Sequence, residues 1–219
     1  MQLVIRTDAD DVDSRLAELG LSRAVLEEPV AQGVMARSEC TPNDPPLFPG
    51  ISVWARTVRS LREKLIPVPF GWSRCDEGNY PLCVSPDGKL AIAVATGDEN
   101  TGNPNVMPMT KSPKGPRTQN AISVNQYNGQ GNLFETLPEF DPEVLLNKDR
   151  VTWILLQHFD QVRREVRFEL SLPTSYSGRI DGWSERIIFG AISTDPSQVI
   201  PVPTLPNLPD IDVPLRRRA

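Results

Sequence analysis

The chain has 219 residues, a formal net charge of −5 and a pI of about 5.0. Its 39% hydrophobic and 23% charged residues are typical of a globular protein, and the length is enough for one large domain with a sizeable core. The acidic balance argues against broad, non-specific binding to DNA or anionic membranes, because both need a basic surface. The unusual feature is proline, since its 22 residues are about twice the usual share of roughly 5%.

The cysteines and the N-terminus indicate the compartment. Cys40, Cys75 and Cys83 are odd in number and form no C-x-x-C pair, which argues against a disulfide framework or a zinc site. The N-terminus lacks the basic region and long apolar run of a signal peptide. No apolar stretch approaches the roughly 20 residues that span a bilayer. The sequence therefore predicts a cytoplasmic protein without membrane contact.

Residues 1–40 predict a small helical segment that follows a short strand at 2–6. Apolar residues spaced i, i+4, i+7 from Val12 predict a first helix. Ser22 can cap a second short helix, and Pro29 can begin a third. Three short helices could read DNA as a helix-turn-helix, but the many acidic side chains here would face phosphate. A packing or partner-binding lobe is favoured.

Residues 41–50 predict a linker, because prolines remove backbone donors and block a helix there. The clearest helix follows at 52–65. One apolar stripe runs along it, formed by Trp54, Val58, Leu61 and Leu65. Its arginines and lysine lie mostly off that stripe. They predict a solvated face, or alternatively a basic face for an acidic partner or a nucleic-acid backbone.

Residues 51–195 predict an α+β core domain with a mainly antiparallel sheet of about five strands. A hairpin is expected over 80–95, with an Asp87-Gly88 turn. Its second strand, 90–95, is apolar on both faces, which predicts a central position. The helix at 52–65 is expected to cover one face of the sheet as its one amphipathic helix. Further strands are expected at 151–158, 165–172 and 185–192.

A long polar loop runs from Thr96 to Asn132, where hydrophobic periodicity disappears. Loops beyond about 15 residues are uncommon inside compact domains and tend to be functional or disordered. A short strand at 121–127 could hold its far end. Three cations on a proline and glycine frame could bind phosphate or carboxylate, contact a partner or nucleic acid, or simply be solvated. The residues expected to bind a ligand or partner are Asp98, Glu99, Lys111, Lys114 and Arg117.

The segment from Gly97 to Gly102 has the strand–G-x-x-x-x-G frame of a phosphate-binding loop. Asn103 and Pro104 stand where that loop needs lysine and serine or threonine. The acidic residues at 98 and 99 would also repel phosphate. A glycine-bearing turn after a central strand is the favoured interpretation.

His158 is the only histidine, which excludes a multi-histidine metal site and restricts any histidine-based catalysis to this residue. It is expected to be structural, with a general-base role beside Asp160 as the alternative. Glu165, Arg167 and Glu169 alternate along one strand face and resemble the E-x-K element of restriction-type nucleases, but arginine replaces the lysine. We therefore expect no catalytic residue, no metal and no cofactor.

Residues 196–219 predict a proline-rich C-terminal arm. Prolines interleave with aliphatic residues from Ser197 to Leu215, so the segment can be neither a helix nor an inner strand. It suits an extended, polyproline-like conformation. Because it is too apolar for a solvated linker, we expect it to lie in a groove, on its own domain or on a partner.

Three segments, 90–99, 110–118 and 183–188, resemble those of a family of uncharacterised bacterial proteins found on mobile elements and in defence islands. The resemblance covers roughly residues 50–192. It implies a bacterial, cytoplasmic setting, with helicase and methyltransferase genes as expected neighbours. It brings no catalytic residues to this chain.

The sequence thus favours a non-enzymatic accessory or regulatory subunit of a bacterial intracellular complex, such as an anti-phage defence complex. It would act through a protein partner or as a homo-oligomer through the C-terminal arm, with nucleic acid less favoured. The alternative is an enzyme or small-ligand sensor that binds an anionic ligand at loop 96–118.

Overall fold

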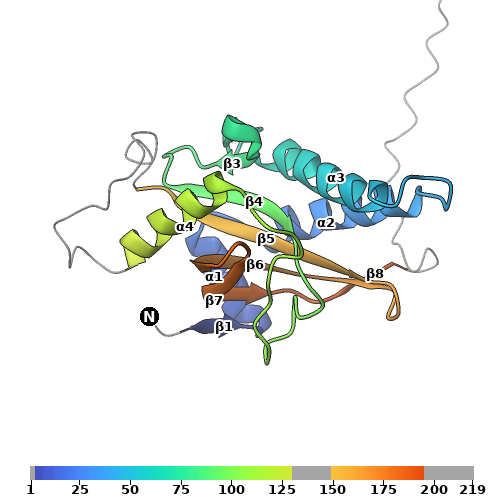
Figure 1. Cartoon of the computed structure of the whole chain (residues 1–219). Helices are drawn as coiled ribbons and strands as arrows, with labels where there is room; N and C mark the ends of the chain where they lie inside the picture. Colours follow the sequence, from blue (N-terminus) through green and yellow to red (C-terminus); the bar gives the residue numbers. More distant parts are fainter. Residues whose placement is uncertain (1–2, 130–148, 195–219) are drawn as a thin grey trace, which may run out of the picture.

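The computed structural model describes residues 3–129 and 149–194. The expected C-terminal arm and the end of the expected long loop lie outside these residues. Within them, the fold is an α+β arrangement of four α-helices and one mixed eight-stranded sheet (Figure 1). None of the described helices combines the length and the hydropathy that crossing a bilayer requires.

The strand order is β1-β7-β6-β5-β4-β3-β2, and the short β8 pairs with β6. The bounds are β1 Val4–Arg6, β2 Ser73–Cys75, β3 Leu82–Val84, β4 Leu90–Thr96, β5 Val151–Asp160, β6 Glu165–Tyr176, β7 Ile180–Ile188 and β8 Ile192–Ser193.

The expectation of a mainly antiparallel sheet of about five strands is wrong in strand number and in two pairings. β4 pairs in parallel with β5, and β1 pairs in parallel with β7. Parallel neighbours need a crossover connection, and α4 (Pro116–Gly129) lies between β4 and β5 in the chain. The expected strand at 121–127 is instead part of this helix, which Pro116 begins at a position where proline is tolerated.

The hairpin prediction is confirmed. β3 and β4 are antiparallel, and β4 lies centrally between β3 and β5. The amide of Ser85 donates to the carbonyl of Leu90 at 2.8 Å and closes the turn. Gly88 has a φ of +73°, the left-handed conformation that favours glycine in turns.

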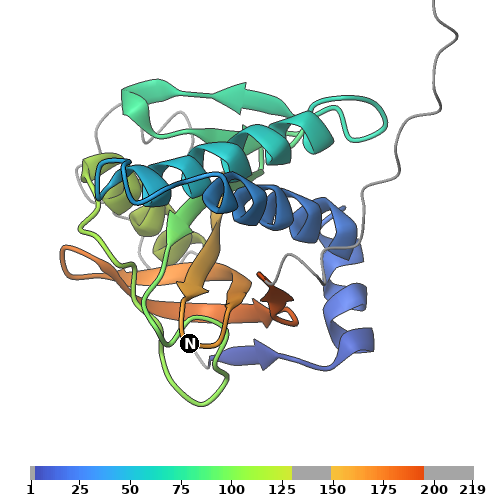
Figure 2. The same cartoon turned by 90° about the vertical axis from the view of Figure 1, so that its right-hand side faces the viewer.

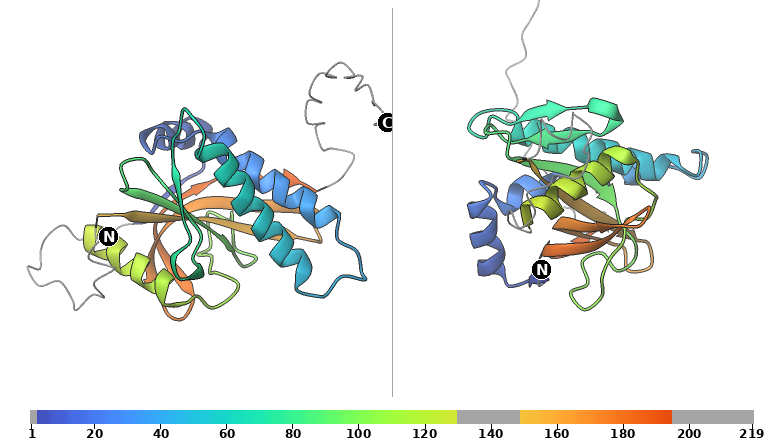
Figure 3. Two further views of the ribbon diagram at one scale, coloured as in Figure 1. Left: turned by 90° about the horizontal axis from the view of Figure 1, so that it is seen from above. Right: turned by 60° about the vertical axis from the view of Figure 1, so that its left-hand side comes forward.

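Both faces of the sheet are covered. Helices α1 (Ala9–Glu18), α2 (Arg23–Ser38) and α3 (Phe48–Leu65) pack on one face, so more than one helix covers it. Figures 2 and 3 show α2 and α3 side by side across the strands. The other face is covered by α4, through Ile122, and by the loop after β4, whose Pro108 carbonyl accepts from the indole Nε1 of Trp183 at 2.8 Å. The second and third expected helices are one continuous α2, because core packing of its apolar side chains outweighs the interior Pro29.

The close approach of α2 and α3 depends on Gly33. A Cβ there would lie 2.4 Å from Thr57 Oγ1 and 3.1 Å from the Val53 carbonyl oxygen. Further along α3, the indole Nε1 of Trp54 donates to the carbonyl of Val94 in β4 at 3.1 Å. These contacts fix α3 across the end of β4, where the candidate site lies.

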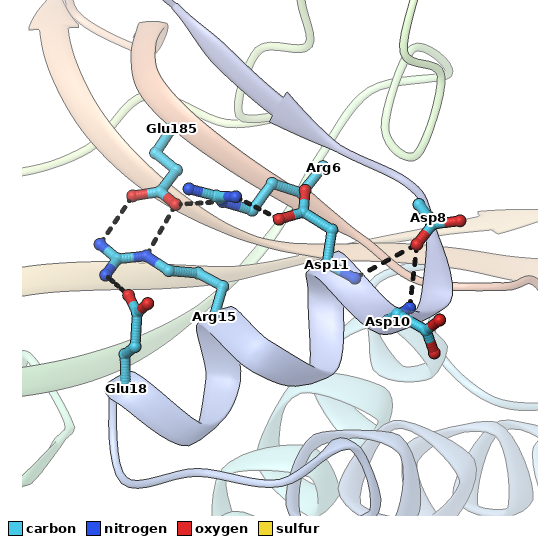
Figure 4. Close-up of polar contacts among 7 residues, drawn as sticks. All are labelled: Arg6, Asp8, Asp10, Asp11, Arg15, Glu18 and Glu185. Atoms are coloured by element: carbon cyan, nitrogen blue, oxygen red, sulfur yellow. Dashed lines mark hydrogen bonds and ion pairs between the residues drawn. The ribbon is translucent and has the colours of Figure 1, made fainter.

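Glu185 in β7 ties the first strand and helix to the sheet (Figure 4). Its carboxylate accepts from Arg6 Nε at 2.8 Å and from Arg15 at 2.8 and 2.9 Å. Asp8 caps α1 by accepting from the amides of Asp10 and Asp11. Burial raises the pKa of Glu185, but the hydrogen bonds from the two arginines outweigh it and leave that pKa below its usual value.

Candidate functional site

The loop after β4 is held to the sheet by backbone hydrogen bonds. The amide of Asp98 donates to the Met109 carbonyl, and the amide of Lys111 donates to the Thr96 carbonyl, both at 2.9 Å. Further along, the amide of Lys114 donates to Gly178 at 3.0 Å. The loop therefore leaves β4, folds back on itself and reaches the β6–β7 turn before α4 begins.

A buried ion pair beneath this loop supports it from the sheet. Glu169 and Arg186 are 0% and 1% exposed, and Arg186 Nη2 lies 2.6 Å from Glu169 Oε2. The guanidinium also donates to the carbonyls of Asn103 and Val106, at 3.1 and 3.0 Å. Glu169 accepts from the amide of Gly102 at 2.9 Å. Glu169 Oε1 accepts from Arg186 Nε and from the Ser171 hydroxyl, while Glu169 Oε2 and the two terminal guanidinium nitrogens hold loop backbone.

This arrangement bears on three interpretations of the sequence. Alternation along the strand predicts an exposed Glu169, but Glu169 is buried because the loop covers this face of β6. The nuclease-like resemblance fails, since Arg167 pairs with Asp160 and Glu165 instead of completing a site with Glu169. The Gly97 to Gly102 segment is a glycine turn: the amide that a phosphate would need at Gly102 is bonded to a carboxylate.

A groove runs between the first turns of α3 and residues 111–117, across the carboxyl ends of the parallel strands β4 and β5. It consists of three neighbouring cavities of about 270, 670 and 450 Å³. The first two share Trp54 and Lys114, and the last two share Arg37 and Lys111. The shared lining residues place the three cavities next to one another, and we call the three together the α3 groove.

Four of the five expected binding residues line the α3 groove. Lys114 and Arg117 line the 270 Å³ cavity, Lys111 lines the other two, and Glu99 lines the 450 Å³ cavity. Asp98 is not in the groove. Its carboxylate accepts from the amide of Asn100 at 3.1 Å and shapes the turn after β4.

The α3 groove is rich in cations. In the described part of the chain, neither Lys111 nor Lys114 has a carboxylate within ion-pair distance. Burial lowers the pKa of Lys114, because removing water disfavours the charged amine. Arg37 lies over the ring of Phe159, 4.1 Å from its centroid. The groove therefore collects positive charge in a chain whose net charge is −5.

One wall of the groove is apolar, and sequence reasoning missed it. The stripe of α3 continues upstream at helical spacing to Ile51 and Leu47, which are 55% and 78% exposed. Both line the 670 Å³ cavity. Downstream, Leu61 and Leu65 on the same stripe are buried in the core. The signal was present in the sequence, because the spacing of the stripe extends into the segment expected to be a linker.

His158 and Asp160 line the 450 Å³ cavity but are engaged separately. His158 Nδ1 lies 3.3 Å from the Gly97 carbonyl oxygen. Asp160 accepts from the amides of Val162 and Arg163, and these bonds, with Arg167 nearby, lower the pKa of Asp160. Among residues 3–129 and 149–194, no three His, Cys, Asp or Glu side chains are grouped as metal ligands.

Comparisons with protein-family models, with curated proteins and with solved structures found no match for this chain. The resemblance to bacterial proteins of mobile elements and defence islands thus stays a prediction.

Proposed function

We propose that the protein is a non-enzymatic accessory subunit that binds an acidic, extended segment of a partner protein in the α3 groove. The observation that carries this proposal is the combination of Lys111 and Lys114, without carboxylate partners in the described residues, with the exposed apolar wall of Leu47 and Ile51. A bacterial defence complex as the setting comes from the sequence resemblance alone and is part of the proposal.

The dimensions of the groove favour a chain segment over a compact molecule. Pockets for small ligands usually have volumes of about 300–1,000 Å³. The α3 groove exceeds this range when its three cavities are taken as one. An extended peptide can place alternate side chains on the cations and on the apolar wall along such a length.

Nucleic acid fits less well. A phosphate backbone needs a continuous basic surface, whereas Glu99 stands at one end of the groove and two aliphatic side chains form its wall. The net charge of −5 would also repel a long polyanion.

The test is a comparison of two charge-reversal variants in affinity purification from the native host with quantitative mass spectrometry. The groove variant is Lys111→Glu with Lys114→Glu. The matched control is Arg74→Glu with Lys89→Glu, which changes the net charge equally at exposed cations outside the groove. We expect partners with acidic segments to be lost by the groove variant alone. Retention of every partner by a folded groove variant would contradict the proposal.

A second candidate is a sensor of a small anionic ligand, favoured by one observation. The half-buried Lys114, Arg117 and the aromatic residues Trp54 and Tyr80 all line the 270 Å³ cavity. A cavity with cations and aromatic rings in its lining suits a planar ring that bears a phosphate or carboxylate. Calorimetric titration with nucleoside phosphates and aromatic carboxylates tests it. Saturable binding that Lys114→Ala abolishes would support this candidate over the first.

A further inference from the structure

We infer that the α3 groove is occupied by the chain's own residues 206–215 when no partner is bound. This inference rests on the groove of the proposed function and names the segment that fits it. The sequence of the segment is Pro-Asn-Leu-Pro-Asp-Ile-Asp-Val-Pro-Leu.

The described chain ends beside the groove. β8 pairs Ile192 with Val166, and the amide of Thr194 donates to the Arg164 carbonyl at 2.8 Å. Val166 itself lines the 450 Å³ cavity. Residues 195–205 connect this point to the segment, and an extended chain rises by about 3.1 Å per residue. The 11 residues of the connection can therefore span about 34 Å from the end of the described chain.

The chemistry of the segment matches that of the groove. Asp210 and Asp212 alternate with Ile211 and Val213, so a β-type extended conformation, which has a period of two, places the carboxylates on one side and these aliphatic side chains on the other. The carboxylates suit Lys111 and Lys114, and the aliphatic side chains suit the uncovered stripe of α3. Each Å² of apolar surface that the two sides remove from water contributes about 25 cal/mol. The prolines already restrict the undocked segment, so docking costs less conformational entropy.

The order of charges along the C-terminal segment also matches the order of charges along the groove. The segment has its carboxylates at 210 and 212 and is followed by Arg216, Arg217 and Arg218. The groove has Lys114 and Arg117 at one end and Glu99 near the other. A segment that lies along the groove can therefore meet opposite charges at both ends.

The test is zero-length carbodiimide cross-linking of the full chain, since this reagent joins an amine to a carboxylate only when the two are in contact. We expect cross-links from Lys111 or Lys114 to Asp210 or Asp212, identified by mass spectrometry after digestion. They should disappear in the variant Asp210→Asn with Asp212→Asn. The ion pair between Lys64 and Glu28 is the internal positive control, and it should cross-link in every sample.

Mixing with an isotopically labelled copy of the chain decides whether the contact is internal. We expect cross-linked pairs within one copy. Pairs that join labelled to unlabelled chains would overturn the inference in favour of a second copy. A sample in which only the Lys64 control cross-links would also overturn it. Neither result contradicts the proposed function if the Lys111→Glu, Lys114→Glu variant still loses its partner. Failure of this inference can therefore be told apart from failure of the proposed function.

Discussion

Replacing Arg186 by methionine should destabilise the protein severely, because it removes one half of the buried ion pair beneath the loop. The change leaves Glu169, which is 0% exposed, without its counter-charge. It also removes the donor from two loop carbonyls, at Asn103 and Val106. Breaking a buried pair by removing one partner costs about 3–5 kcal/mol. That is a large share of the roughly 5–15 kcal/mol that stabilises a typical domain.

Urea unfolding followed by tryptophan fluorescence measures the loss, and hydrogen exchange of the loop amides reports where it occurs. The matched control adds Glu169→Gln to Arg186→Met. Glutamine keeps an acceptor for the Gly102 amide but removes the uncompensated charge, so the double variant should regain part of the lost stability. A loss below about 1 kcal/mol in the single variant would refute the reasoning, because surface substitutions rarely exceed about 0.5 kcal/mol.

Three further predictions concern the core and its ion pairs. Because the folded pKa of Glu185 is lowered, its stabilising effect is complete above the unfolded pKa of about 4.3 and is lost as pH falls through the folded value. As pH falls, the free energy of unfolding should therefore decrease less steeply in Glu185→Gln than in the natural chain. Equal slopes of this free energy against pH would contradict the prediction. Gly33→Ala should cost about 1–3 kcal/mol in urea unfolding through overpacking of α2 against α3; a neutral result would show that the helices can separate freely. Burial raises the pKa of Cys83 to about 11, so a thiol reagent at pH 8 should modify the half-exposed Cys40 and Cys75 first. Simultaneous reaction of all three thiols in the folded protein would contradict the burial of Cys83.

Part of the candidate site could be predicted from the sequence. Glu99, Lys111, Lys114 and Arg117 were singled out because cations and acids stand close together in a proline- and glycine-rich segment. The apolar wall of Leu47 and Ile51 could not be placed beside them. Some 60 residues of chain separate the two sides of the groove, and only the packing of α3 over β4 brings them together.

The sequence by itself determined the local elements. A continuous apolar run specifies β5, alternating apolar residues specify β6, the Asp87-Gly88 turn specifies the β3–β4 hairpin, and the apolar stripe specifies α3. Only the tertiary structure decided that β4 and β5 are parallel, that Glu169 is buried and that the stripe of α3 runs beyond the core. The physical reason is that periodicity records which face of an element avoids water. The element that covers that face, or leaves it open, comes from a distant part of the chain.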